Sequence, residues 1–145
     1  MNKKAMLAGR QGFTLLFSLL FVSVTLAISL GISDLVISQI ELSGTGRNSQ
    51  FAFYAADSAA ECAIYWDRAE NKFSTSTSST ISCSGQSGIP VGGAPASSFS
   101  LNFDNGSCAT VEVNKADPAE TVVTSIGQNP CNGARKVERG LEIRY

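Results

Sequence analysis

The chain has 145 residues and a mass of 15.2 kDa, which is the size of one domain at ~100–200 residues per domain. Its 11 Lys and Arg against 12 Asp and Glu give a net charge of -1. No basic excess is available to bind a phosphate backbone, so we expect no nucleic-acid partner. The chain contains no histidine, which removes Ser-His-Asp and Cys-His nucleophile pairs and imidazole metal sites. We therefore expect neither an enzyme nor a resident metal or cofactor.

The apolar residues gather near the N-terminus. Residues 1–12 are basic, and the following stretch, 13–33, carries no charge at all. Its length matches the ~20 helical residues that cross the hydrocarbon core of a bilayer, and a basic flank stays on the cytoplasmic side. This pattern predicts a single span of the cytoplasmic membrane, in contact with lipid, with the N-terminus in the cytoplasm and the rest of the chain outside.

This segment has three interpretations. A cleaved secretory signal has an apolar region of ~7–15 residues and an Ala-x-Ala-like site, whereas the run here is longer and its end, residues 27–31, lacks that pattern. A plain signal anchor fits the length and the flanks. The third interpretation depends on the residues at the junction between the basic and apolar parts.

That junction reads Arg10-Gln11-Gly12-Phe13-Thr14-Leu15-Leu16 and resembles the prepilin peptidase site of type IV pilins. The resemblance implies that 1–12 is a leader, cut between Gly12 and Phe13 on the cytoplasmic side, and that Phe13 becomes an N-methylated terminus. The helix is then retained as an assembly helix. The implied partners are a prepilin peptidase, an inner-membrane assembly platform and other pilin or pseudopilin subunits.

The fifth residue after this junction departs from the common pattern of major pilins. It is Phe17, where most of them have a Glu that neutralises the terminal amine of a neighbouring subunit. An uncompensated charge in apolar surroundings costs several kcal/mol. The K-type pseudopilin of type II secretion also lacks this Glu. The resemblance therefore implies a minor subunit, at or near the tip of the filament.

Small hydroxyl residues recur along one face of the apolar helix. Such residues allow helices to approach closely in lipid or in a filament core. Alternatively, each hydroxyl bonds back to a carbonyl one turn earlier in its own helix. The predicted assembly contacts in this segment are Thr14, Phe17, Ser18, Thr25 and Ser29.

An amphipathic continuation of the helix is expected over 34–70. We expect a kink or a melted turn at Gly44-Thr45-Gly46, because each glycine in a helix interior costs ~1 kcal/mol. Beyond it, one stripe should pack on a sheet: Phe51, Tyr54, Ala55, Ala59, Cys62 and Trp66. The block 53–63 also resembles the corresponding block of PilX-type minor pilins.

Asp57 and Glu61 lie one helical turn apart on this segment. Like charges at that spacing destabilise an isolated helix by about 0.2–0.5 kcal/mol. Our hypothesis is that an Arg or Lys of a neighbouring subunit compensates them, so both are predicted assembly contacts. The alternative is that both are simply solvated.

The remaining chain divides into a loop and a sheet. Residues 71–98 are rich in Ser, Thr and Gly and predict a loop without a packed core, either an exposed adhesive or glycosylated surface or a plain connector. Between residues 99 and 145, apolar residues occupy every second position in several runs, and turn residues separate these runs. This pattern predicts a four-stranded antiparallel meander with one face covered by the helix.

The four cysteines are expected to form two disulfides, because the exported part of the chain lies in an oxidising compartment. Three pairings are open. We favour Cys108 with Cys131, since both fall at the same end of the predicted sheet, which leaves Cys62 with Cys83. A zinc site is the alternative, but no two of these cysteines lie close together in the sequence.

The sequence thus predicts an α+β fold in which a long N-terminal helix, half transmembrane and half amphipathic, packs on a four-stranded antiparallel sheet, as the pilin resemblance implies. The implied function is that of a minor, tip-associated subunit of an extracellular type IV pilus or of a periplasmic pseudopilus. The alternative is a signal-anchored extracytoplasmic binding or enzymatic domain that is not part of a filament.

Overall fold

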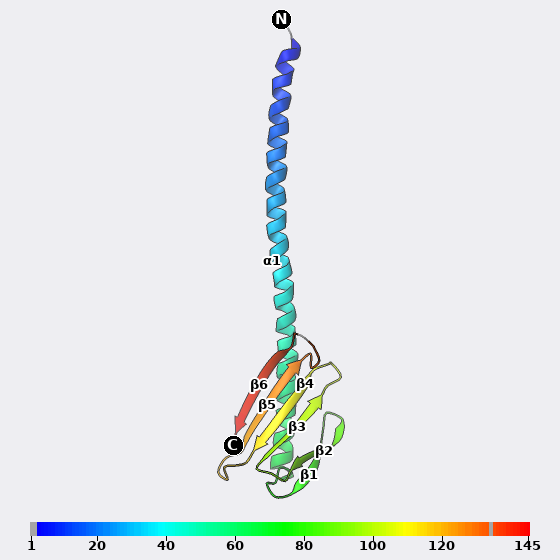
Figure 1. Cartoon of the computed structure of the whole chain (residues 1–145), viewed down its shortest axis with the longest axis vertical. Helices are drawn as coiled ribbons and strands as arrows, with labels where there is room; N and C mark the ends of the chain where they lie inside the picture. The colour runs from blue at the N-terminus through cyan, green and yellow to red at the C-terminus, as the bar shows by residue number, and fades with distance from the viewer. Residues whose placement is uncertain (1–2, 134) are drawn as a thin grey trace. The chain divides into compact units, whose positions relative to one another are not determined.

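The computed structural model describes residues 3–133 and 135–145 of the chain, with side chains from Gly12 onward. Part of the predicted leader, residues 1–2 and the side chains before Gly12, therefore lies outside the described residues. The chain divides into two compact units, Met1–Ser43 and Gly44–Tyr145. One helix, α1 (Lys3–Arg68), runs through both (Figure 1).

In the described residues of the first unit, 3–43, α1 is the only element. Its large apolar side chains from Phe13 to Leu42 are between 48% and 74% exposed. An apolar surface of this extent is rare on soluble monomers and marks a membrane or protein interaction surface. The helix continues without interruption through Gly44-Thr45-Gly46. The predicted melted turn is therefore wrong, because the cost of two glycines is small beside the hydrogen bonds that a long continuous helix makes.

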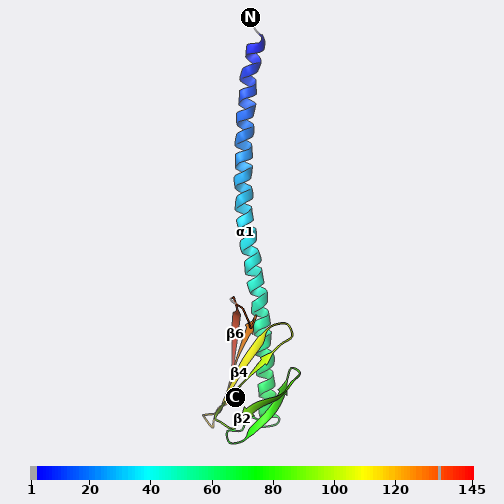
Figure 2. The same cartoon turned by 45° about the vertical axis from the view of Figure 1, so that its right-hand side comes forward.

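The second unit holds the end of α1 and two antiparallel sheets. Four strands form the larger sheet in the order β3-β4-β5-β6, which confirms the predicted antiparallel meander. Their bounds are Ala96–Asn102, Cys108–Asn114, Val122–Asn129 and Val137–Arg144. The α1 segment of this unit lies against one face of this sheet (Figure 2), so the α+β architecture is that of a helix packed on a sheet.

The residues 71–98, predicted as a loop, contain the smaller sheet. Strands β1 (Ser78–Cys83) and β2 (Gln86–Gly92) pair antiparallel. The prediction of a loop without a packed core is wrong because Ile81, Val91 and Phe73 are at most 3% exposed and join the main core. Only a few apolar residues alternate among many Ser, Thr and Gly, so the period-two signal is weak here, although Thr is itself favourable in strands.

Two disulfides join these elements. Cys62 of α1 is bonded to Cys83 at the end of β1, and Cys108 at the start of β4 is bonded to Cys131 after β5. These are the pairs that the sequence analysis favours. The first disulfide attaches the β1–β2 hairpin to the helix, and beside it the Trp66 indole N–H donates to the Ser82 carbonyl over 2.9 Å.

Alanine forms the face of α1 that packs on the larger sheet. All of the following are at most 3% exposed: Ala52, Ala55, Ala56, Ala59, Ala60 and Ala63. The predicted stripe is wrong at Tyr54, whose side chain is 63% exposed. Tyr54 is absent from this face because small side chains let the helix backbone approach the sheet more closely than an aromatic ring would permit.

The helix and the sheet approach each other closely at β5. A Cβ atom placed on Gly127 would lie 1.9 Å from the Ala52 carbonyl oxygen and 2.7 Å from the Ala56 nitrogen. Next to it, the fully buried Ser125 hydroxyl donates to the Ala56 carbonyl over 2.7 Å. The helix therefore lies directly on the backbone of this strand.

Candidate functional site

The first candidate site is the junction between Gly12 and Phe13. Both residues are helical in the structure, and the Phe13 side chain is 72% exposed. A Cβ atom on Gly12 would meet nothing within 4 Å. No described side chain outside the two chain neighbours of Gly12 therefore packs on the open side of this residue.

The apolar segment that follows the junction fits a membrane. By length and composition α1 is the one described helix able to cross a bilayer, with a window of mean hydropathy 2.5 and none of it buried. A helix of this kind is a single membrane span or a signal anchor. The coarse prediction of a transmembrane helix therefore agrees with the structure.

Several hydroxyls of this segment bond to carbonyls of their own helix. Ser18 donates to the Leu15 carbonyl over 2.9 Å, and Thr25 donates to the Val22 carbonyl over the same distance. Ser33 donates to the Ser29 carbonyl over 3.0 Å. These bonds are those of the alternative interpretation, and they satisfy the hydroxyl donors where no water is present. Contacts of this face with another helix remain a prediction.

Phe17 lies on the same helix and has no described packing partner in the core. Its side chain is 62% exposed. A residue that is apolar and exposed at this position supplies contact area for lipid or for another helix, and it supplies no charge. Its role as an assembly contact, like that of Thr14, is not tested by the structure.

A second candidate site is the exposed side of α1 in the second unit, outside the alanine face. We use the term outer aromatic face for Phe53, Tyr54 and Tyr65, which are 43%, 63% and 60% exposed. Asp57 is half-buried and Glu61 is exposed on this part of the helix. Exposed aromatic side chains are enriched at protein interaction surfaces, whereas Asp and Glu are depleted at the centre of such surfaces. Compensation of Asp57 and Glu61 by another subunit remains a prediction.

At the end of α1, a buried carboxylate organises three elements. Asp67 is 6% exposed and forms an ion pair with Lys115, the residue after β4. The Tyr145 hydroxyl donates to the second oxygen of Asp67 over 2.9 Å, and the Arg68 guanidinium lies 4.3 Å from the centre of the Tyr145 ring. The carboxylate is paired and hydrogen-bonded, as a buried charge must be.

This environment raises the pKa of the Tyr145 hydroxyl well above its ordinary value. Burial is the largest cause, followed by the hydrogen bond to Asp67 and the repulsion of that carboxylate. A phenolate here would lose the hydrogen bond and face a negative charge. The folded state therefore resists ionisation that the unfolded chain undergoes near pH 10.

The raised pKa predicts a loss of stability in alkali. The contribution of Tyr145 to the free energy of unfolding is fully present below about pH 10 and declines as the pH rises above it. We expect the stability difference between the wild type and Tyr145→Phe to be constant from about pH 8 to about pH 9 and to be smaller at about pH 11. Urea unfolding of the detergent-solubilised chain, followed by Trp66 fluorescence, measures it. A difference that stays constant over this range would contradict the assignment.

The described residues do not converge on an evident catalytic or metal centre. No group of three or more His, Cys, Asp or Glu in the described part of the chain could hold a metal ion. In the β3–β4 turn, the Asn105 side-chain oxygen accepts from the Ser107 amide over 3.0 Å and from its hydroxyl over 2.6 Å. That oxygen is therefore engaged in its own turn. The expectation that the chain is not an enzyme stays a prediction.

Comparison with known proteins adds no identification. Family models, curated proteins and solved structures were compared with the chain, and none of them matched it. Any assignment of this chain to a class of proteins therefore has to be argued from its own sequence and structure.

The sequence analysis did not identify several residues that hold the fold together. The pairing of Asp67 with Lys115 and Tyr145 joins distant parts of the chain, and no local pattern indicates it. Gly127 did leave a signal, because an isolated glycine inside a strand pattern indicates a bulge or the close approach of another backbone.

Proposed function

We propose that this chain is a minor subunit of a type IV pilus or a related pseudopilus. In this proposal a prepilin peptidase removes residues 1–12, Phe13 becomes the N-methylated terminus, and the assembly platform in the inner membrane incorporates the subunit into the filament. The chain starts as a single-pass protein of the cytoplasmic membrane with its N-terminus in the cytoplasm. It ends in an extracellular pilus or a periplasmic pseudopilus.

The observation that carries the proposal is the junction itself. A basic segment ends in Gly12, and Phe13-Thr14-Leu15 opens a helix that continues without interruption to Arg68. A secretory signal is discarded with its apolar region. A cut before Phe13 would instead leave the whole apolar helix on the mature protein, where it can both anchor the subunit and pack against others.

The exposed surfaces of α1 support assembly by helix packing. The large apolar side chains of residues 13–42 are exposed in the first unit, and those of the outer aromatic face are exposed in the second. A soluble monomer would leave these surfaces in water, which is unfavourable at roughly 25 cal/mol per Å² of apolar surface. Lipid covers the apolar side chains of the membrane segment before assembly, and other helices cover both surfaces in a filament.

Phe17 favours a minor subunit in this proposal. A subunit without a carboxylate at this position has no partner to offer the terminal amine of a neighbour, and an unpaired buried charge is costly. A position at the tip avoids that cost because no further subunit lies above it.

The experiment that tests this proposal is mass spectrometry of the mature N-terminus. We expect a chain that begins at Phe13 and carries one extra methyl group on its amine, when the protein is isolated from cells with a prepilin peptidase. The same sample should contain the chain in sheared filaments or cross-linked to other subunits. A chain that retains residues 1–12 would contradict the proposal and would identify a signal-anchored domain instead.

A further inference from the structure

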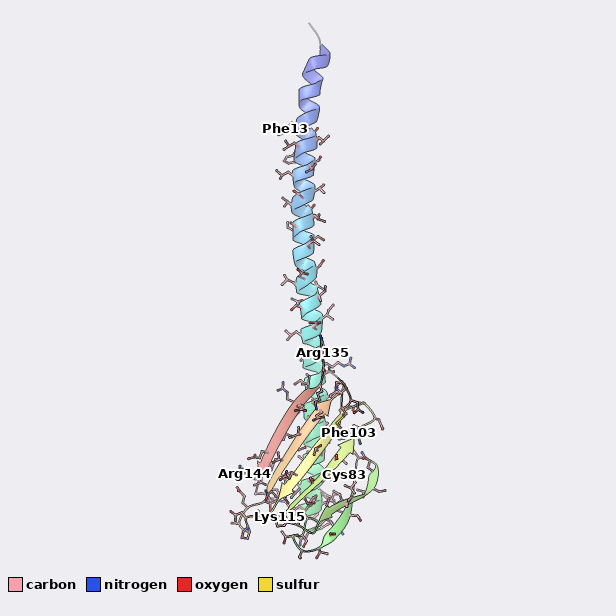
Figure 3. All side chains as sticks on the ribbon, in the orientation of Figure 1. Phe13, Cys83, Phe103, Lys115, Arg135 and Arg144 are labelled. Carbon is pink, nitrogen blue, oxygen red and sulfur yellow. A yellow bond between two sulfur atoms is a disulfide. The ribbon has the colours of Figure 1, made fainter. Side chains whose placement is uncertain are left out.

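The strand ends near Phe103 border a hollow in the second unit. Its volume is about 320 Å³, and the residues that line it come from the β3–β4 turn and from the loop after β5. Figure 3 labels Phe103 at this end of the sheet and Lys115 at the other. We use the term amide hollow for the space between Asn102, Phe103, Ser107, Pro130, Cys131 and Asn132.

The walls of the amide hollow are held in place by covalent and hydrogen bonds. The Cys108–Cys131 disulfide joins its two sides, and the Cys131 amide donates to the Gly106 carbonyl over 3.1 Å. From β2, the Gln86 side chain donates to the Asn102 carbonyl over 2.7 Å. Such a surface loses little conformational freedom when it binds a ligand.

The chemistry of the lining is polar but uncharged. The amide side chains of Asn102 and Asn132 are on exposed residues and Phe103 is half-buried, whereas the hydroxyl of the buried Ser107 already donates to Asn105. A charged ligand would find no opposite charge among these lining residues. A purely apolar ligand would leave the amides without partners, which costs free energy. A ligand rich in hydroxyl groups satisfies the amides and places its C–H groups against the Phe103 ring.

A smaller hollow adjoins the first. It has a volume of about 120 Å³ and shares Phe103 and Ser107 with the amide hollow, and its other lining residues include Tyr54 and Ser58 of α1. Two adjoining hollows lined by hydroxyl, amide and aromatic groups have the chemistry to bind a ligand that is built from linked polar rings. The larger one falls at the lower end of the ~300–1,000 Å³ that small-molecule sites occupy.

We propose that the amide hollow binds a neutral oligosaccharide, with the Phe103 ring against one sugar ring and the side chains of Asn102 and Asn132 on its hydroxyls. This binding site is additional to the proposed filament function and does not depend on it. In either setting it places a sugar-recognising surface on the part of the chain beyond the membrane segment.

The test uses the full chain in fluorescent nanodiscs on an array of neutral oligosaccharides that end in hexoses, fucose or N-acetylhexosamines. Sialylated and sulfated forms of the same oligosaccharides are included. We expect at least one neutral oligosaccharide to bind. Phe103→Leu keeps an apolar side chain but removes the ring face, and Asn132→Ala removes one amide from an exposed loop. Each should weaken that binding about tenfold.

Thr80→Ala is the matched control. Thr80 is an exposed residue beside a different hollow, together with Lys72, Ser78, Ser79 and Pro90, and its substitution should leave sugar binding unchanged. Trp66 fluorescence checks that each variant is folded, and if Phe103→Leu fails this check the result for Asn132→Ala decides. The proposal is overturned if no neutral oligosaccharide binds, if only sialylated or sulfated forms bind, or if the tested substitutions leave binding unchanged.

Discussion

Gly127→Ala is expected to lower the free energy of unfolding of the second unit by about 3 kcal/mol or more. The added methyl group would lie 1.9 Å from the Ala52 carbonyl oxygen and 2.7 Å from the Ala56 nitrogen. Both are backbone atoms of a helix and cannot rotate away. The helix must therefore move off β5, which also breaks the buried hydrogen bond from Ser125 to Ala56.

Gly140→Ala is the matched control for this prediction. Gly140 lies on the neighbouring strand β6, directly paired with Ile126, and its added Cβ would have Ser125 O at 3.9 Å as its nearest neighbour. We expect a change within about 0.5 kcal/mol. Urea unfolding of the detergent-solubilised full chain, followed by Trp66 fluorescence, measures both variants. Equal effects of the two substitutions would show that the helix does not lie on β5 as described.

Gly12→Val is expected to leave nearly all of the chain unprocessed. In the proposed function the peptidase must accept the backbone around the bond between Gly12 and Phe13, and a branched side chain beside that bond blocks its approach. The substitution should not disturb the helix itself, because nothing lies within 4 Å of a Cβ at Gly12. The unprocessed chain stays in the membrane and does not enter filaments. Mass spectrometry of the N-terminus and recovery of sheared filaments measure these outcomes.

Gly31→Val separates processing from a general effect on the apolar helix. Gly31 is also helical, and a Cβ there would meet nothing within 4 Å. The same substitution at this position should leave processing at the wild-type level, because Gly31 is distant from the cleaved bond. Efficient processing of Gly12→Val, or equal loss of processing in both variants, would argue against a cleavage site at Gly12.

Patterns local in sequence predicted much of this fold. The alternation in Phe99 to Phe103 and in Ala109 to Val113 indicated strands, and both regions contribute strands of the four-stranded sheet. The pairing of Cys108 with Cys131 followed from the meander, since strand order places those residues at the same end. These predictions succeeded because the period of a strand and the length of its turns are properties of short segments.

Two of the predictions that failed depended on residues distant in the sequence. The β1–β2 hairpin was missed because its few apolar residues, Ile81 and Val91 among them, are spread among polar ones and become recognisable only against the core that buries them. Tyr54 was assigned to the sheet side of α1 because a hydrophobic stripe shows which residues are apolar, not how wide the gap is that they must fill.

Of the candidate sites, one was predicted from a short stretch of sequence and one was visible only in the folded chain. The junction at Gly12 and the apolar run behind it were predicted from the sequence alone, since charge, residue size and hydropathy act over a short stretch of chain. The amide hollow could not be predicted, because it lies between the turn after β3 and the loop after β5, and only the folded sheet brings Phe103 and Asn132 to its two sides.

The amino-acid sequence by itself determined that this protein has an apolar N-terminal helix with a basic flank and an alternating, antiparallel sheet after it. Tertiary structure alone decided how closely the helix approaches that sheet. The distance between two backbones is set jointly by Ala52 and Ala56 on one element and by Ser125 and Gly127 on another. A glycine in a strand can indicate that another backbone comes close, but no local pattern shows which distant residues it meets.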